Sequence, residues 1–465
     1  MNQALIDYYR CPAALVQFVF NGPPPSSQPR FFRFGNATCY GRTSESLPST
    51  PAPGLSAVPS HRQGSAALSF DLTEIAENLR RERYLESHDV SSKALPELAF
   101  IRWAYYVIRP LLSVGVRRQF QKLRLNDWKQ IPFPRWPIDT SVDDLMRSAL
   151  RLQLETTRGQ PIPFIWFWPE SYPSCAILTH DVEEEKGCKF CLDLLGIDES
   201  YGMKSSFQIV PEERYDVPPG LLEEIKRRGF EVNVHDLNHD GHLFRDRLTF
   251  LQRAAKIIAY RKSFGAEGFR SGSMYRNANW LSDLDFFYDM SVPNAAHLEP
   301  QRGGCCTVMP YRLGNVIELP LTITQDYSLM HILGEYSTEL WEAEIEYLIR
   351  KNGLVSIIVH PDYVLEPRAL SLYRSLLEYL SGLRNQGTLW MPLPRDVAHW
   401  WQLRSRMQLE QRTDGWSVAG EGSERATVAY ASLENERLVY NVGTRRIVDC
   451  GESACPVPSQ FRANS

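Results

Sequence analysis

Two pairs of residues of metal-binding type stand out in this sequence. His235 and His239 are spaced four apart, which places both imidazoles on one side if the strand end turns into a helical loop. Asp181 and Glu183 are two apart at the end of an apolar run, so their side chains share a face and can converge on one ion. Two imidazoles and one carboxylate leave positions open for water and substrate, as at catalytic zinc. The four residues therefore predict a metal centre.

The histidine pair also has an interpretation that involves no metal. His235 and His239 can act as capping and loop residues that hydrogen-bond to the backbone, and their spacing alone does not decide between the two roles. The carboxylates of Asp181 and Glu183 at another strand end favour the metal centre.

More ionisable residues follow other apolar runs in the same part of the chain. Arg270, Asp289 and His360 each lie at or near the end of such a run, and seven of the ten histidines fall between His180 and His360. Reactive groups of parallel β/α proteins collect at the carboxyl ends of the strands. We therefore expect these side chains to gather around the metal centre.

The elements that must position these residues alternate between short β-rich runs and amphipathic helical segments. Pro218–Arg228 is one such helix, with a proline at its start and Gly229 immediately after it. Repeated strand and helix predict parallel pairing and, at this length, a β/α barrel. The expected strands are Ala176–Glu183, Ser205–Val210, Glu231–His235, Gly268–Ser271, Phe286–Pro293, Val316–Ile323, Leu354–His360 and Leu389–Leu393.

In this order, the motifs resemble those of the polysaccharide deacetylase family, the NodB-homology or carbohydrate esterase 4 group, over about residues 171–405. The resemblance implies an α/β fold, a distorted (β/α)7 barrel. It also implies that Asp181 is the catalytic base and that Glu183, His235 and His239 hold the metal. The first motif departs from the family's two adjacent aspartates, because the second carboxylate here is a glutamate one position later.

The resemblance assigns roles to residues beyond the metal ligands. Arg270 would orient the base, His360 would be the general acid, and Asp289 would favour protonated His360 by charge pairing. The backbone N–H of Tyr275 or of a neighbour is the expected oxyanion donor. His180 is either a further ligand or, as alternation along the strand favours, a residue packed on the opposite face.

The implied activity is hydrolysis of a non-peptide C–N bond with the help of a divalent metal, Zn²⁺ or else Co²⁺, Ni²⁺ or Mn²⁺. The expected substrate is an N-acetylated sugar or glycan precursor, from which the enzyme removes the acetyl group. Two other interpretations stay open. One is a non-catalytic carbohydrate-binding or scaffold protein that keeps the barrel, and the other is a C–N hydrolase acting on a small non-sugar amide.

Composition limits the class of protein. A net charge of −4 and a hydrophobic fraction of 43% indicate a soluble globular protein with no affinity for nucleic acid. The nine cysteines do not form a disulfide pattern. No basic region precedes the apolar run at 13–20, and Arg102 and Arg109 interrupt the apolar stretch Ala99–Val116, so we expect neither a signal peptide nor a membrane span. A cytoplasmic location follows, and the oligomeric state is not indicated.

The chain divides by composition into four predicted regions. Residues 1–70 are rich in proline and serine and are expected to be poorly ordered, because such a segment buries too little apolar surface to offset its ordering entropy. Residues 71–170 form a predicted helical accessory region, 171–408 the barrel, and 409–465 a small β-rich tail with a disordered end. The aromatic run at 164–168 fits packing against the barrel better than sugar stacking.

Overall fold

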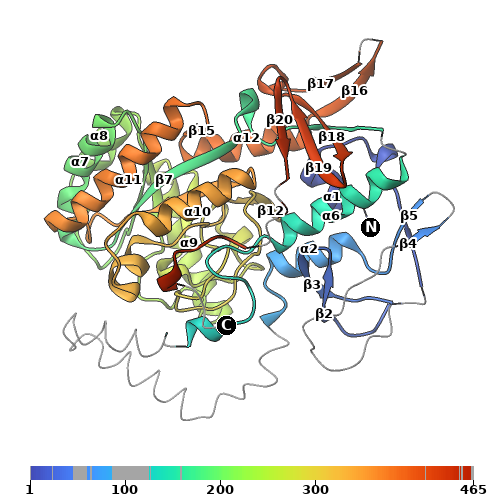
Figure 1. Cartoon of the computed structure of the whole chain (residues 1–465). Helices are drawn as coiled ribbons and strands as arrows, with labels where there is room; N and C mark the ends of the chain where they lie inside the picture. Colours follow the sequence, from blue (N-terminus) through green and yellow to red (C-terminus); the bar gives the residue numbers. More distant parts are fainter. Residues whose placement is uncertain are drawn as a thin grey trace.

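A computed structural model describes most of the chain, and Figure 1 shows its arrangement. A barrel-like α/β part lies beside a second part built from the N-terminal segments and the C-terminal strands. The described residues are 2–22, 25–44, 60–62, 65–85, 125, 127–157, 160–413, 415–449, 451 and 454–461.

A curled, mostly parallel sheet forms the centre of the α/β part. Its strands follow the order β12-β13-β11-β10-β9-β8-β7-β14, and β15 pairs with β7. All of these pairings are parallel except that of β12 with β13. The strands are β7 (Ser174–Val182), β8 (Ser206–Ile209), β9 (Glu231–His235), β10 (Gly268–Arg270), β11 (Tyr288–Asp289), β12 (Tyr311–Leu313), β13 (Val316–Glu318), β14 (Leu354–Ile358) and β15 (Leu389–Trp390).

The barrel closes through a side chain where strand pairing stops. The hydroxyl of Thr322, downstream of β13, donates to the carbonyl oxygen of Leu354 at 2.7 Å and accepts from the Ser356 N–H at 2.9 Å. Within the described part of the chain, β13 and β14 are not paired with each other as strands. The predicted distorted (β/α)7 barrel is therefore confirmed.

Helices cover the outside of the sheet. Capping residues fix their ends: Asp246 accepts from the Thr249 N–H at 2.8 Å at the start of α9, and Gly265, with φ of +57°, ends it. The helix expected at Pro218–Arg228 begins later because Gly220 is left-handed, with φ of +80°. The helices are α7 (Glu185–Ser200), α8 (Leu221–Arg227), α9 (Arg247–Phe264), α10 (Glu339–Arg350), α11 (Pro367–Asn385) and α12 (Pro394–Arg406).

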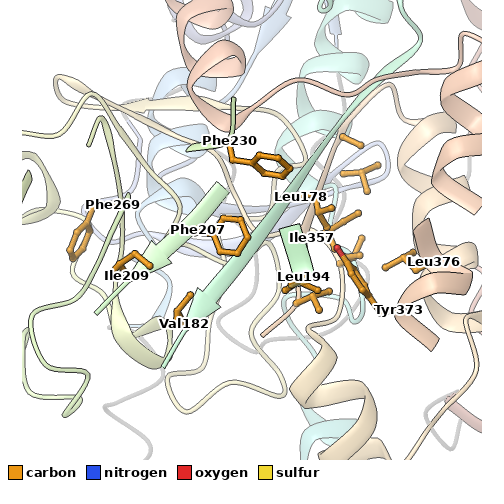
Figure 2. Close-up of a cluster of buried hydrophobic side chains, with 14 of the residues drawn as sticks. Leu178, Val182, Leu194, Phe207, Ile209, Phe230, Phe269, Ile357, Tyr373 and Leu376 are labelled. Atoms are coloured by element: carbon orange, nitrogen blue, oxygen red, sulfur yellow. The ribbon is translucent and has the colours of Figure 1, made fainter. Parts of the chain in front are cut away.

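The first hydrophobic core lies between the sheet and these helices. Figure 2 shows Phe207 of β8 and Leu178 of β7 near Leu194 of α7, with Tyr373 and Leu376 of α11 on the same side. All five side chains are buried. This core holds the strands in the register that brings their carboxyl ends together.

The N-terminal segments contain more structure than their composition predicts. In residues 1–70, the described parts form a helix and short strands, while residues 1, 23, 24, 45–59, 63 and 64 lie outside the described residues. Phe32 and Phe34 alternate along a strand and contact Phe70 at 5.0 and 5.2 Å between ring centroids, which supplies the apolar burial that the average composition hides. The elements are α1 (Gln3–Tyr9), β1 (Phe18–Phe20), β2 (Arg30–Phe34), β3 (Ala37–Gly41), β4 (Ser60–Arg62), β5 (Ser65–Leu68), α2 (Leu72–Arg80) and α6 (Ser141–Thr156).

The C-terminal strands are completed by a strand that precedes the barrel. β6 (Ile162–Ile165) pairs antiparallel with β18 (Val428–Glu434), which continues through β19 (Arg437–Val442) to β20 (Arg445–Val448). A separate hairpin joins β16 (Gln408–Arg412) to β17 (Gly415–Ala419).

A second core joins these parts to the barrel. It includes Tyr9 of α1, Phe164 of β6, Ile177 of β7, Trp400 of α12 and Tyr440 of β19, all buried. The aromatic run at 164–168 is buried here, as its packing role predicts. In the described residues, no helix is both long and apolar enough to cross a membrane, and the stretch Ala99–Val116 lies outside them.

Candidate metal centre and catalytic site

The structure brings together the three residues predicted to hold the metal. Candidate ligand atoms of Glu183, His235 and His239 all lie within 4.8 Å of one another. Glu183 Oε1 is 2.9 Å from His239 Nε2 and 3.9 Å from His235 Nε2. Both Nε2 atoms are buried and have no aligned hydrogen-bond partner. Buried polar atoms are nearly always paired, so two such nitrogens facing one carboxylate fit a metal cation.

The backbone around the site selects the tautomer of His235. Its Nδ1 lies 3.1 Å from the carbonyl oxygen of Arg270, which can only accept a hydrogen bond. The proton is therefore placed on Nδ1, and the lone pair of Nε2 points into the site. This use of a backbone carbonyl is typical of metal-binding histidines.

The loop after β9 does not continue as a helix, contrary to the basis of the histidine prediction. Asp236 and His239 are left-handed, with φ of 55° and 52°. Gly272 of the next loop packs directly against them: a Cβ there would lie 2.9 Å from His239 Cδ2 and 2.5 Å from an Asp236 carboxylate oxygen. The tight turn and the neighbouring glycine bring His239 back toward His235.

Asp181 occupies the position expected of the base. Its carboxylate accepts from Arg270 Nη1 at 2.6 Å, and its other oxygen lies 3.8 Å from His235 Nε2. Burial alone would raise the pKa of Asp181, but the charges of Arg270, His235 and His360 outweigh it and lower that pKa below its usual value. Arg270 is fixed in turn by the hydroxyl of Thr179 at 2.8 Å.

His360 occupies the position expected of the acid, and Asp326 holds it. The Asp326 carboxylate lies 2.6 Å from His360 Nδ1 and accepts from the His360 backbone N–H at 2.7 Å. His360 Nε2 lies 3.6 Å from Glu183 Oε1, so it faces the metal ligands. Burial would lower the pKa of His360, but the Asp326 charge outweighs it and raises that pKa well above its usual value.

The predicted pairing of Asp289 with His360 is wrong. Asp289 accepts from the backbone N–H and the hydroxyl of Ser291 at 2.9 and 2.8 Å, and it lies in register with Glu318 of β13. The reason is topological, because β11 and β14 are separated in the sheet order. Asp326 reaches His360 because the chain after β13 returns alongside β14.

His180 and Tyr275 have the surroundings of structural residues. His180 is buried, with Nδ1 2.9 Å from the Val359 carbonyl and Nε2 2.9 Å from the Asp198 carboxylate, which confirms that it packs on the face opposite Asp181. The Tyr275 backbone N–H donates to the Gly272 carbonyl at 3.2 Å, so that donor already closes a turn. Its role as an oxyanion donor stays a prediction.

Asp362 was not predicted, although it fixes the backbone of Glu183, a candidate metal ligand. One carboxylate oxygen accepts from the N–H groups of Glu183 and Glu184 at 3.0 and 3.3 Å, and the other accepts from Gly187 at 2.9 Å. These are donors at the start of α7 that have no partner within the helix. The His-Pro-Asp sequence that contains His360 therefore supplies both the candidate acid and the anchor of the Glu183 loop.

The rings of Tyr363, Tyr327 and His331 form an aromatic wall next to His360, the candidate acid. The Tyr363 ring lies 4.9 Å from the imidazole of His360, and the rings of Tyr327 and His331 each lie 5.3 Å from Tyr363. Tyr327 and His331 belong to the turn that follows Asp326, part of which is a π-helix (Ser328–Leu333). Such π-turns are frequent at functional sites.

A hollow that is open to solvent lies against the same segment, with a volume of about 330 Å³ that includes this open space. Gln325 and Ser328, which flank Asp326, line it together with Trp136 of the accessory region and Glu299. Gln325 donates to the Glu299 carboxylate at 2.7 Å, and burial raises the pKa of Glu299 to about 7. The hollow thus combines the aromatic side chain of Trp136 with hydrogen-bonding groups.

Comparisons with known proteins find deacetylases at low similarity. No family model and no curated protein matches the chain. A Mycobacterium smegmatis structure described as a candidate polysaccharide deacetylase is 18% identical, covering 51% of this chain and 93% of that chain, with a TM-score of 0.41. A Pseudomonas aeruginosa PAO1 structure of similar description is 14% identical, covering 50% and 93%, with a TM-score of 0.40. Peptidoglycan deacetylase PdaC from Bacillus subtilis is 14% identical, covering 50% and 93%, with a TM-score of 0.32. These neighbours carry the name of the family that the sequence motifs resemble.

Proposed function

We propose that the chain is a metal-dependent hydrolase that removes the acetyl group from an N-acetylated sugar or glycan precursor. The observation that carries the proposal is that the buried Nε2 atoms of His235 and His239, neither of which has an aligned hydrogen bond, both face the carboxylate of Glu183. Asp181 and His360 border this cluster with the protonation states that amide hydrolysis requires.

Glu183, His235 and His239 would hold the ion, which is Zn²⁺ or else Co²⁺, Ni²⁺ or Mn²⁺. When bound, it supplies Lewis-acid polarisation of the acetyl carbonyl. The extra methylene of Glu183 lets its Oε1 reach to within 3.6 Å of His360 Nε2 as well as toward both ligand histidines. These distances support the proposal that Glu183 would take the place of the shorter aspartate that is common in the family.

The proton transfers follow from the positions of the base and the acid. Asp181, held ionised by Arg270, takes a proton from the attacking water. The C–N bond breaks as His360, held protonated by Asp326, gives its proton to the leaving nitrogen. The products are acetate and the free amine of the sugar. The aromatic wall of Tyr327, Tyr363 and His331 would exclude water from one side of the acid.

One experiment separates this proposal from the alternatives. Metal content is measured first, followed by acetate release from a panel of N-acetylated sugars, with and without a chelator. We expect bound divalent metal and acetate release that the chelator abolishes and added Zn²⁺ restores. Bound metal with no acetate from any sugar would favour a hydrolase of small non-sugar amides. Sugar binding without metal would favour a carbohydrate-binding scaffold.

A further inference from the structure

A buried ion pair joins the accessory region to the loop that follows Arg270. Glu82 lies just after α2, and its carboxylate accepts two hydrogen bonds from the guanidinium of Arg276, that from Nε at 2.8 Å. The two side chains are 7% and 0% exposed. A two-point bond between an arginine and a carboxylate fixes orientation as well as distance.

Arg276 also contacts the turn at 272–274, which lies beside the candidate metal ligands. Its Nη1 donates to the carbonyl oxygen of Met274 at 2.9 Å. Ser273 and Met274 are both left-handed, with φ of 53° and 54°. Conformations of this kind persist in non-glycine residues only where surrounding contacts hold them. The Arg276 guanidinium, which is held by Glu82 and bonds to the Met274 carbonyl, makes such a contact.

The turn at 272–274 in turn touches the candidate metal centre. Gly272 packs against the ring of His239, where a Cβ would lie 2.9 Å from Cδ2. Met274 clusters with Leu321 and with Ile358, two residues before His360. A shift of this turn therefore moves a metal ligand and the support of the acid together.

On its other side, Glu82 also fixes a second barrel loop. Its Oε1 accepts from the Gly304 N–H at 2.5 Å, and the nearby Tyr84 hydroxyl donates to the Gly304 carbonyl at 2.7 Å. A Cβ at Gly303 would lie 2.4 Å from Glu82 Oε1, so this glycine allows the close approach. Glu82 is thus enclosed by barrel loops although it belongs to the accessory region.

We propose that Glu82 is a positioning residue of the metal centre, which acts through Arg276 and the 272–274 turn on His239. The inference rests on the proposed metal site but not on the identity of the substrate. It assigns a function to the accessory region, which lies outside the residues 171–405 that resemble deacetylases. The barrel alone would have the ligands without the constraint that holds His239 in place.

The test measures metal affinity as well as turnover in the full chain. Zn²⁺ dissociation constants, the visible spectrum of the Co²⁺-loaded protein, kcat and KM are compared for wild type, Glu82→Gln and Glu82→Asp at a temperature where all are folded. Glu74→Gln is the matched control, because Glu74 of α2 forms an exposed pair with Arg42, with side chains 21% and 51% exposed.

We expect Glu82→Gln to weaken Zn²⁺ binding about 10–100-fold and to alter the Co²⁺ spectrum, as for other residues that support metal ligands. Glu82→Asp should recover part of the affinity, and Glu74→Gln should match wild type.

The alternative outcomes are distinct. A Glu82→Gln variant that loses thermal stability but keeps wild-type metal affinity, spectrum and kcat would overturn the inference. If that variant does not fold, Arg276→Lys replaces it, because lysine keeps the buried charge but cannot bond to Glu82 at two points and to the Met274 carbonyl at the same time. Unchanged metal affinity in this variant would also overturn the inference. Metal binding without acetate release overturns the proposed substrate alone, and a wild-type chain that binds no metal overturns both.

Discussion

At the residue scale, the site depends on two charged contacts, each of which sets the protonation of one group. Arg270 stabilises ionised Asp181, and Asp326 stabilises protonated His360, against the effect of burial on both. At neutral pH the base is therefore ionised and the acid protonated. Glu183 lies between them, within 4 Å of three histidines.

We expect Asp181→Asn to lower kcat by about 10²–10⁴-fold, because the amide cannot take the proton of water. Metal content should be retained, since Asp181 is not among the three clustered ligands. Acetate release and metal analysis on the same sample test this. Loss of the metal together with the activity would show instead that Asp181 is a ligand.

A pair of substitutions, at Glu183 and at His180, tests the assignment of the metal ligands. Glu183→Gln should weaken Zn²⁺ binding strongly, because its carboxylate faces the Nε2 atoms of both histidines. His180→Asn, which changes a residue of β7 whose side chain lies on the opposite face, should destabilise the fold and leave Zn²⁺ affinity unchanged. Competition with a chromophoric chelator measures both. Equal effects of the two variants would contradict the ligand assignment.

The pH profile separates the roles of Asp326 and Asp289. Because the His360 pKa is raised, activity should persist as pH rises and fall only when His360 loses its proton. Asp326→Asn removes the charge that raises this pKa, so the alkaline limb of kcat/KM should move to lower pH. Asp289→Asn should leave that limb in place, since Asp289 bonds to Ser291 instead. An alkaline limb that moves only in Asp289→Asn would restore the original pairing.

At the element scale, the carboxyl ends of β7, β9, β10 and β14 supply the reacting groups, while tight loops decide their final positions. The loop after β9 and the turn after β10 pack against each other through Gly272. Neither loop has a regular conformation, and both contain left-handed residues other than glycine. The strands set the location of the site, and these loops set its geometry.

Gly272→Ala tests the contact between these loops. The added Cβ would lie 2.5 Å from Asp236 and 2.9 Å from His239, so we expect a loss of about 1–3 kcal/mol and weaker Zn²⁺ binding. Gly382→Ala is the control, because a Cβ there meets nothing within 4 Å on helix α11. That change should stabilise the fold by about 0.5–1 kcal/mol without affecting the metal. Unfolding in urea and Zn²⁺ titration measure the two effects.

At the scale of the whole molecule, the barrel is not separate from what surrounds it. The second core contains Ile177 and Trp400 of the barrel region next to Tyr9, Phe164 and Tyr440 from the segments before and after it. All five are buried, so removing the flanking segments would expose apolar surface on the sheet. A unit cut at residues 171–408 would lack one side of its own core.

We therefore expect the fragment 171–408 to aggregate or to bind hydrophobic dyes, unlike the full chain. Limited proteolysis of the full chain should leave a core that retains segments from both sides of the barrel. Expression of the fragment, dye binding and mass spectrometry of the proteolytic products measure these results. A soluble, cooperatively folding fragment with wild-type metal affinity would contradict the prediction and would also remove the need for Glu82.

The sequence predicted the features that local pattern encodes. The expected strand Glu231–His235 has the observed bounds, because an apolar run ends there at a turn. Asp181, Glu183, His235, Arg270 and His360 lie at or just beyond such strand ends, where parallel folds collect reactive groups. Their types and order were sufficient to place them in one site.

What the sequence did not predict depends on contacts between distant segments. Asp326 follows an irregular stretch beyond β13, and only the return of that stretch alongside β14 brings it to His360. Glu82 is separated from Arg276 by 194 positions. The order in residues 2–22 and 25–44 rests on aromatic contacts such as Phe32 with Phe70, which average composition does not reveal.

The pairing of β6 with β18 also determines when the protein can finish folding during its synthesis. β6 leaves the ribosome before any strand of the barrel, yet its partner is made only after α12. Until β18 has been synthesised, β6 of the nascent chain has no partner along the edge that β18 will occupy. All four residues of β6 are buried in the folded protein. Closure of the second core is thus a late, long-range step, and pairings of this kind form slowly because the intervening chain must be closed first.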